Sequence, residues 1–274
     1  MPEPEVKFLQ RDNPGNIANQ SSNQSAYPSG YRTAYRAQPG KSAETGRPSV
    51  VFCSGFRSDM EGSKAVALAG WCAAHEIDFL RFDYFGHGQS EGDFLDGTMS
   101  LWRQDVFGLL DALTTGPQIL VGSSFGGWLS LMAAAEMPET VSGLVLVAPA
   151  VDMTERLMWA RFSPEARQQL ENEGIFYDPS DYDAQGYPIT KALIEDGRQY
   201  LMLDKPSAIP IDVPVRILHG QEDHAVPWQL SLELAEKISG QDVELHFVKN
   251  GDHSLSAPDN LELLTGTLKN LIGF

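Results

Sequence analysis

The sequence predicts an α/β fold in which a mostly parallel sheet is flanked by helices. Along most of the 274 residues, apolar segments of strand length alternate with amphipathic segments of helix length, which is typical of a parallel sheet covered by helices. One of these strands runs directly into a Gly-x-Ser-x-Gly turn at residues 122–126, and one long interval, 152–210, lacks the alternation. Together these observations indicate a sheet-based domain that carries an insertion.

The alternation predicts eight strands and five covering helices. The strands are expected at 5–10, 32–37, 49–53, 78–83, 118–122, 142–148, 213–219 and 243–248. The helices are expected at 63–75, 100–114, 125–136, 228–239 and 259–272. A segment rich in Asn, Ser, Gln and Gly, 13–30, joins the first two strands and is expected to be a mobile surface loop.

The interval 152–210 contains amphipathic pieces at 154–162 and 189–203 but no convincing strand. Compact domains rarely carry connections this long. We therefore predict a helical cap, 152–210, inserted after the sixth strand of a core formed by 1–151 and 211–274. The alternative is an ordinary crossover with additional helices.

Composition and charge exclude several classes of function. The chain has 37 acidic and 20 basic residues and a formal net charge of −17, which opposes binding to nucleic acid or to anionic membranes. No apolar run is long enough to span a bilayer. Cys53 and Cys72 fall on a predicted strand and the following helix and are expected to be reduced and buried. The acidic first residues resemble neither a signal peptide nor a transit peptide, so a cytoplasmic location is expected.

Ser124, at the centre of the Gly-x-Ser-x-Gly turn, is the first candidate for covalent chemistry. A serine in such a sharp strand-to-helix turn presents its hydroxyl at the edge of the sheet, and Gly122 and Gly126 keep strand and helix from clashing. Such a serine needs a base. His253 follows the last strand in a Gly-containing loop and is our candidate, ahead of His224, His219, His246 and His75.

The candidate acid is Asp223, which follows the predicted strand 213–219 and so lies at the carboxyl edge of the sheet. Asp152 is a weaker alternative acid, and Asp252 is more simply a loop residue. The order Ser124, Asp223, His253 distinguishes one class of hydrolase from others with the same triad. The sequence therefore predicts a Ser-His-Asp triad.

Hydrolysis at a carbonyl also needs donors for the oxyanion. The backbone N–H of Phe125 lies at a helix N-terminus, and the N–H of Phe56 lies in the loop after the strand 49–53. We predict these two groups as the oxyanion hole.

An apolar acyl tunnel is the candidate substrate site. Trp128, Trp159 and Val226 are its main predicted residues, and Met132, Leu157, Met158, Phe162 and Trp228 are further candidates, although an apolar stripe at helical spacing is more often core than pocket. Arg57, Arg156 and Arg161 are candidates for binding a carboxylate, with solvated surface arginines as the alternative. The turn 83–88 lacks the full dinucleotide pattern, and His and Cys spacing indicates no metal site. No cofactor or metal is expected.

Several longer blocks resemble one family. Residues 54–65, 81–90, 102–106, 116–124, 126–128 and 226–228 are similar to the abhydrolase-domain palmitoyl-protein thioesterases of the α/β-hydrolase superfamily, whose mitochondrial animal member is also called mycophenolic acid acyl-glucuronide esterase. The block Gly-Pro-Gln-Ile-Leu-Val-Gly-Ser-Ser, 116–124, is much more specific than the serine motif alone. The resemblance implies an α/β-hydrolase fold and places the triad on Ser124, Asp223 and His253. It fades in the predicted cap.

These observations predict a serine hydrolase that cleaves carboxylic esters or thioesters through an acyl-enzyme. The expected partner is a small-molecule ester or acyl thioester, or an acylated protein; no nucleic acid or membrane partner is expected, and the sequence does not predict an oligomeric state. Hydrolysis of carbon–carbon bonds or of amides on the same triad, and a non-catalytic small-molecule receptor, are the alternatives.

Overall fold

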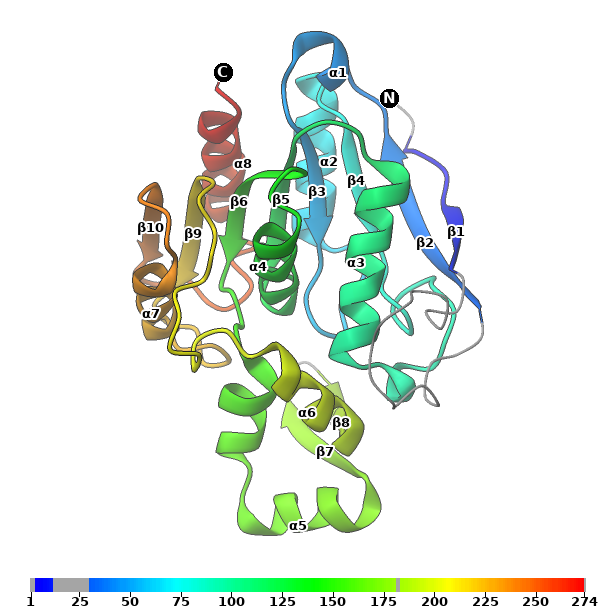
Figure 1. Cartoon of the computed structure of the whole chain (residues 1–274), viewed down its shortest axis with the longest axis vertical. Coiled ribbons are helices and arrows are strands. Elements are labelled where there is room, and N and C mark those ends of the chain that lie inside the picture. Colours follow the sequence, from blue (N-terminus) through cyan, green and yellow to red (C-terminus); the bar gives the residue numbers. More distant parts are fainter. Residues whose placement is uncertain (1–2, 12–29, 181–182, 274) are drawn as a thin grey trace.

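A computed structural model describes residues 3–11, 30–180 and 183–273 and shows one twisted sheet with helices on both faces (Figure 1). The strand order is β1-β2-β4-β3-β5-β6-β9-β10. β2 pairs antiparallel with β1 and β4, and all other neighbours are parallel. The strands are β1 (Lys7–Arg11), β2 (Tyr31–Gln38), β3 (Ser49–Cys53), β4 (Phe79–Phe82), β5 (Gln118–Ser123), β6 (Val141–Val147), β9 (Val215–Gly220) and β10 (Val243–Val248).

The central strands are continuous apolar runs because both of their faces are covered. On β3, Val50 and Phe52 pack in the cluster formed with the helices 63–74 and 258–272, whereas Val51 and Cys53 pack in the cluster formed with the helices 99–113, 125–136 and 229–237. This period of two follows from the pleat of the strand. The helices are α1 (Ser42–Thr45), α2 (Ser63–Ala74), α3 (Met99–Leu113), α4 (Phe125–Glu136), α5 (Pro164–Glu173), α6 (Lys191–Gly197), α7 (Gln229–Lys237) and α8 (Pro258–Ile272).

The predicted eight-stranded, mostly parallel sheet flanked by helices is confirmed. The largest differences at element ends are two residues: β1 starts at 7 instead of 5, β9 at 215 instead of 213, and α7 ends at 237 instead of 239. The predicted loop 13–30 lies outside the described residues apart from Gly30.

The segment between β6 and β9 extends beyond the carboxyl ends of the parallel strands, at one end of the molecule (Figure 1). The expectation that this segment contains no strand was wrong, because β7 (Ile175–Ser180) and β8 (Asp183–Thr190) form an antiparallel hairpin. Pro179 and Pro188 interrupt the alternation by which strands are recognised, so the hairpin left no clear pattern. The other elements of the segment between β6 and β9 are η3 (Met153–Met158, a π-helical turn), η4 (Trp159–Arg161), α5, α6 and η5 (Arg198–Tyr200).

Two sets of polar contacts tie this segment to the core. Asp152, the weaker candidate acid, is fully buried and accepts hydrogen bonds from the backbone N–H groups of Met202 (2.7 Å) and Leu203 (2.9 Å). Arg156 pairs with Asp204 and with Glu233 of α7. Asp152 therefore joins the start of the inserted segment to its end, and neither side chain faces the candidate site as an acid or anion-binding group.

Cys53 and Cys72 are free and buried, as predicted, and burial raises the pKa of the Cys53 thiol to about 12. Among the helices of the described ranges, none is both long and apolar enough to cross a membrane.

Candidate active site

Ser124 lies in a strained turn between β5 and α4. Its backbone has φ 54° and ψ −118°, a conformation that L-residues rarely adopt. A Cβ on Gly122 would lie 2.6 Å from the carbonyl oxygen of Gly126, and a Cβ on Gly126 would lie 2.1 Å from that of Cys53. Both positions of the motif therefore require glycine, and the turn directs Ser124 toward the edge of the sheet.

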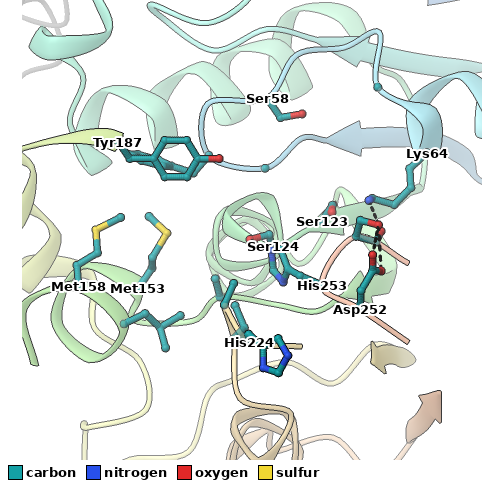
Figure 2. Close-up of a pocket in the computed structure, with 18 of the residues that line it drawn as sticks. Ser58, Lys64, Ser123, Ser124, Met153, Met158, Tyr187, His224, Asp252 and His253 are labelled. Carbon is teal, nitrogen blue, oxygen red and sulfur yellow. Dashed lines mark hydrogen bonds between the residues drawn. The ribbon is translucent and has the colours of Figure 1, made fainter. Parts of the chain in front are cut away.

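Ser124, His253 and Asp223 form one hydrogen-bonded chain at this edge. The Nε2 atom of His253 lies 3.0 Å from the Oγ of Ser124, and its Nδ1 lies 2.6 Å from the Oδ2 of Asp223. Figure 2 shows the side chains of Ser124 and His253 together at the cavity. With a neutral imidazole, Nδ1–H donates to the carboxylate and Nε2 accepts from the hydroxyl. The residues come from the ends of β5, β9 and β10, so the parallel sheet brings them together.

The carboxylate of Asp223 has no exposed side-chain surface and is held by four donors. Its Oδ1 accepts the N–H groups of Ala225 (2.9 Å) and Val226 (2.8 Å), and its Oδ2 accepts from His253 and from Nε2 of His219 (3.1 Å). Burial alone would raise the pKa of Asp223, but the hydrogen bonds from His219 and His253 outweigh it and hold that pKa below its ordinary value. The group is therefore a carboxylate at neutral pH.

The loop after β3 lies directly against Ser124. A Cβ on Gly55 would be 3.6 Å from the Cβ of Ser124. In the described part of the chain, no acceptor takes the N–H of Phe56 or of Phe125. These two predicted oxyanion donors therefore remain available to a ligand at Ser124.

The side chain of His87 holds this loop in place through a hydrogen bond to its backbone. Its Nε2 accepts the N–H of Arg57 (3.2 Å), and its Nδ1 lies 3.0 Å from the carbonyl oxygen of Phe85, to which it donates. Burial lowers the pKa of His87 to about 4, which keeps the ring neutral and Nε2 free to accept. From its sequence, the turn 83–88 was expected to be structural, and the contact between His87 and Arg57 was not predicted.

A cavity of about 560 Å³ opens at Ser124 between the core and the inserted segment. Met153, Met158 and Tyr187 lie on one side of Ser124, and Lys64 and Asp252 lie on the other (Figure 2). Further lining residues include Ala150, Leu157 and Val226, which are apolar, and Ser58, Asp59, Ser63 and Ser254, which are polar. The inserted segment also contributes two charged side chains, Arg161 and Asp178, so its wall is mostly but not wholly apolar, whereas the wall on the other side of the serine is polar.

The structure places the three predicted substrate-binding residues differently. Val226 lines the cavity. Trp128 does not: it has no exposed surface and packs within the core cluster, because it lies on the inward face of α4. Trp159 does not line the cavity either, since its ring stacks against the guanidinium groups of Arg167 (5.2 Å) and Arg198 (5.1 Å).

Several other candidates are also reassigned. Leu157 and Met158 line the cavity as predicted for the tunnel, whereas Met132, Phe162 and Trp228 are not among the lining residues. Arg161 lines it and donates to the carbonyl oxygen of Ala225 (2.9 Å). Arg57 stacks over the rings of Phe94 and Tyr187. Asp252, as expected of a loop residue, accepts from Ser254 and the N–H of Leu255, and His224 lines the cavity without joining the hydrogen-bonded chain.

Three lining residues were not predicted from the sequence: Lys64, Met153 and Tyr187. Lys64 donates to the carbonyl oxygen of Ser254 (2.5 Å), next to His253, and burial lowers its pKa. Tyr187 belongs to the unpredicted hairpin, so no signal could have placed it. Within the described ranges, no group of three His, Cys, Asp or Glu side chains is arranged to hold a metal ion.

Comparison with known families agrees with the class of protein that the fold and this site indicate, an α/β-hydrolase. Residues 45–173 match the family model described as serine aminopeptidase, S33, and residues 114–265 match that of the prolyl oligopeptidase family. A crystal structure of a putative hydrolase from Agrobacterium vitis superposes with a TM-score of 0.86 at 34% identity, covering 98% of this chain and 99% of the other. The chain belongs to the α/β-hydrolase superfamily.

Within that superfamily it belongs to the family of palmitoyl-protein thioesterase ABHD10. The mitochondrial protein of that name from Mus musculus is 40% identical over 226 residues, which are 82% of this chain and 75% of the relative. The Homo sapiens protein is 37% identical over the same share of this chain and 73% of its own length. The structure of mouse α/β-hydrolase domain-containing protein 10 has a TM-score of 0.82 at 36% identity and covers 98% of both chains. This membership supports hydrolase activity on ester or thioester substrates.

Proposed function

We propose that this protein is a serine hydrolase that cleaves carboxylic esters or thioesters through an acyl-enzyme on Ser124. The observation that carries the proposal is the continuous chain from Ser124 Oγ through His253 to Asp223, at 3.0 and 2.6 Å. A serine hydroxyl is a weak nucleophile, and a base that is itself oriented by a buried carboxylate is the arrangement that activates it.

In the proposed reaction, His253 Nε2 takes the proton of Ser124 as Oγ attacks the substrate carbonyl. The N–H groups of Phe56 and Phe125 stabilise the negative charge that develops on the carbonyl oxygen. Asp223 keeps Nδ1 of His253 protonated and stabilises the imidazolium, which then donates its proton to the departing alcohol or thiol. A water molecule attacks the acyl-enzyme with His253 again as base, which releases the acid and restores Ser124.

The two walls of the cavity suggest how such a substrate would lie. Hydrocarbon is favoured where Met153, Leu157, Met158 and Val226 exclude water. A polar leaving group is favoured beside Ser58, Asp59 and Ser63, where hydroxyls and a carboxylate replace hydration. We therefore propose that the acyl chain binds under the inserted segment and the leaving group on the opposite side. The thioesterase name of the relatives agrees with an apolar acyl group.

The test combines covalent labelling with acyl-chain selectivity. A fluorophosphonate should add one adduct to the wild-type protein by intact mass and none to Ser124→Ala. On p-nitrophenyl acyl esters, Ser124→Ala should lose about a million-fold in kcat, with an unchanged thermal melt. Retention of most activity in Ser124→Ala would end the proposal.

Paired esters and thioesters of increasing acyl length then test the substrate class. We expect rates to rise from acetyl toward medium and long chains. A steep preference for acetyl would contradict the placement of the acyl chain, and faster turnover of aminoacyl amides or β-diketones would replace the esterase proposal with one of the alternative hydrolases.

A further inference from the structure

The buried carboxylate of Asp223 is bound by a second histidine on its far side. His219, at the end of β9, has no exposed surface. Its Nε2 lies 3.1 Å from the Oδ2 of Asp223 and 3.1 Å from the carbonyl oxygen of Val226. Both of these atoms only accept hydrogen bonds, so Nε2 carries the proton and donates to them.

The other ring nitrogen of His219 fixes that tautomer. Its Nδ1 lies 2.7 Å from the Oγ of Ser231, a fully buried residue of α7. In a neutral imidazole whose Nε2 is the donor, Nδ1 can only accept, so the Ser231 hydroxyl donates to it. The hydrogen-bonded chain that starts at Ser124 therefore continues through Asp223 and His219 to Ser231.

We propose that His219 is a positioning residue for the acid of this site and that Ser231 holds His219 in its donating tautomer. This inference rests on the proposed serine-hydrolase function. No bond to substrate is involved, since neither residue lines the cavity. Their role is to hold the oxygen of Asp223 that faces His253.

Both histidines donate to the same oxygen, Oδ2, which gives His219 an electrostatic effect as well as a positional one. The bond from His253 is the shorter, 2.6 Å against 3.1 Å. Donation from His219 draws negative charge away from Oδ2, so it weakens the stabilisation of the imidazolium form of His253. Loss of the His219 donor should therefore do two things: misplace the carboxylate and make His253 easier to protonate.

Other charged groups surround this part of the site. Glu222 and His224 flank Asp223, Asp252 precedes His253, and Lys64 of α2 contacts the same loop at Ser254. None of these groups is itself substituted in variants of His219 or Ser231. A shift of the pH profile within this series can then be assigned to the loss of the hydrogen-bond donor to Oδ2, and not to these neighbouring charged groups.

The experiment measures the pH dependence of kcat/KM for a p-nitrophenyl ester in a graded series. His219→Leu, which removes the donor, should lower kcat/KM roughly ten- to hundredfold and move the acidic limb to higher pH by about 0.5 to 1 unit. Ser231→Ala should shift the limb less, in the same direction. His219→Gln, whose amide can still donate, should stay within about threefold of the wild type with the limb unmoved. His246→Leu, on the exposed part of β10, is the matched control and should behave as the wild type.

Equal losses in His219→Leu and His219→Gln with an unmoved acidic limb would overturn the inference and leave His219 as a packing residue. If His219→Leu does not fold, the wild-type ring still provides a test, because 15N NMR should show a protonated Nε2 and an unprotonated Nδ1. The opposite tautomer would overturn the inference. A wild-type protein that takes no fluorophosphonate would instead contradict the proposed function itself.

Discussion

The two sides of the cavity are held in place by different kinds of interaction. On the core side, Ser124, Asp223 and His253 are held by short hydrogen bonds, and Asp223 alone has four donors within 3.1 Å. On the side of the inserted segment, the apolar side chains of Met153 and Met158 line the cavity with Tyr187, and the charged Arg161 and Asp178 complete this side. Methionine side chains are flexible and adapt to what they pack against.

This difference separates chemistry from selectivity. Hydrogen bonds depend steeply on distance and angle, so a single change on the core side should affect every substrate. Apolar contact scales with the area buried, so a change on the other side should affect substrates in proportion to how far they reach. Substitutions at Asp223 and at Met158 therefore should differ in how strongly their effects depend on acyl length.

Asp223→Asn should have the largest effect. The Oδ1 position accepts two backbone N–H groups, so the amide oxygen should stay there and its NH₂ should face His253. That NH₂ can only donate, which forces His253 to protonate Nε2 and removes the acceptor for the Ser124 hydroxyl. We expect kcat to fall about 10⁴-fold for short and long acyl esters alike, as in other triads with the wrong tautomer.

Asp252→Asn and Asp152→Asn are the matched comparisons for this change. Asp252 is adjacent to His253, and its carboxylate accepts from Ser254 and Leu255 of its own loop, so we expect activity within about tenfold of the wild type. Asp152→Asn should loosen the inserted segment, since it loses one of two acceptors for the N–H groups of residues 202 and 203. A larger loss of kcat in Asp152→Asn than in Asp223→Asn would reassign the acid.

The core side was predictable from the sequence because its signals are local. The Gly-x-Ser-x-Gly turn needs glycine for steric reasons at both positions, and Asp223 and His253 each follow an apolar strand whose end must lie at the same sheet edge. Parallel topology then converts three separate local patterns into one site. The same logic predicted that the loop at Gly55 and Phe56 would lie beside Ser124, and a Cβ on Gly55 would be 3.6 Å from the Cβ of Ser124.

The other side was not predictable because it depends on tertiary contacts. Trp128 has the spacing expected of a residue beside Ser124, but the inward face of α4 buries it in the core. Tyr187 reaches the cavity only because β7 and β8 pair with each other. His219 was expected at a strand end with a local hydrogen bond, but its bond to Asp223 was not predicted. His87 gave no signal, since a buried histidine and a surface one look alike in sequence.

His87→Gln tests the support beneath the oxyanion loop through the pH dependence of stability. The unfolded chain binds a proton at His87 near the ordinary pKa of 6.5, whereas the folded chain does so only at about 4. Unfolding therefore takes up a proton between these values, and the free energy of unfolding falls as pH falls from 6.5 to 4, by at most about 3 kcal/mol. Glutamine does not titrate, so the variant should lose about 2 kcal/mol less than the wild type between pH 7 and pH 5.

Urea unfolding at both pH values measures this difference. Burial raises the pKa of Asp83 and Asp105 to about 6, which acts in the opposite direction, but both carboxyls are present in both proteins and cancel in the comparison. His87→Leu should show the same shallower pH dependence and, because it cannot accept the N–H of Arg57, a lower kcat. Identical pH dependence in wild type and both variants would contradict a neutral, buried His87.

Met158→Trp should have the smallest and most selective effect. The larger ring should occupy part of the apolar wall and displace the far end of a long acyl chain. Each methylene kept out of this wall forfeits about 0.8 kcal/mol, so losing two of them should lower kcat/KM for long-chain esters by about tenfold or more. Acetyl esters, which do not reach Met158, should keep a kcat/KM within about threefold of the wild type. Leu232→Trp, a similar change on the exposed surface of α7, should alter kcat/KM for neither acyl length.

The leaving group gives a second readout for Met158→Trp. At fixed acyl length, the ratio of ester to thioester turnover should stay as in the wild type, since the leaving group lies on the opposite wall. Equal losses for short and long chains, combined with a changed ester-to-thioester ratio, would instead place the leaving group under the inserted segment and the acyl chain beside Lys64.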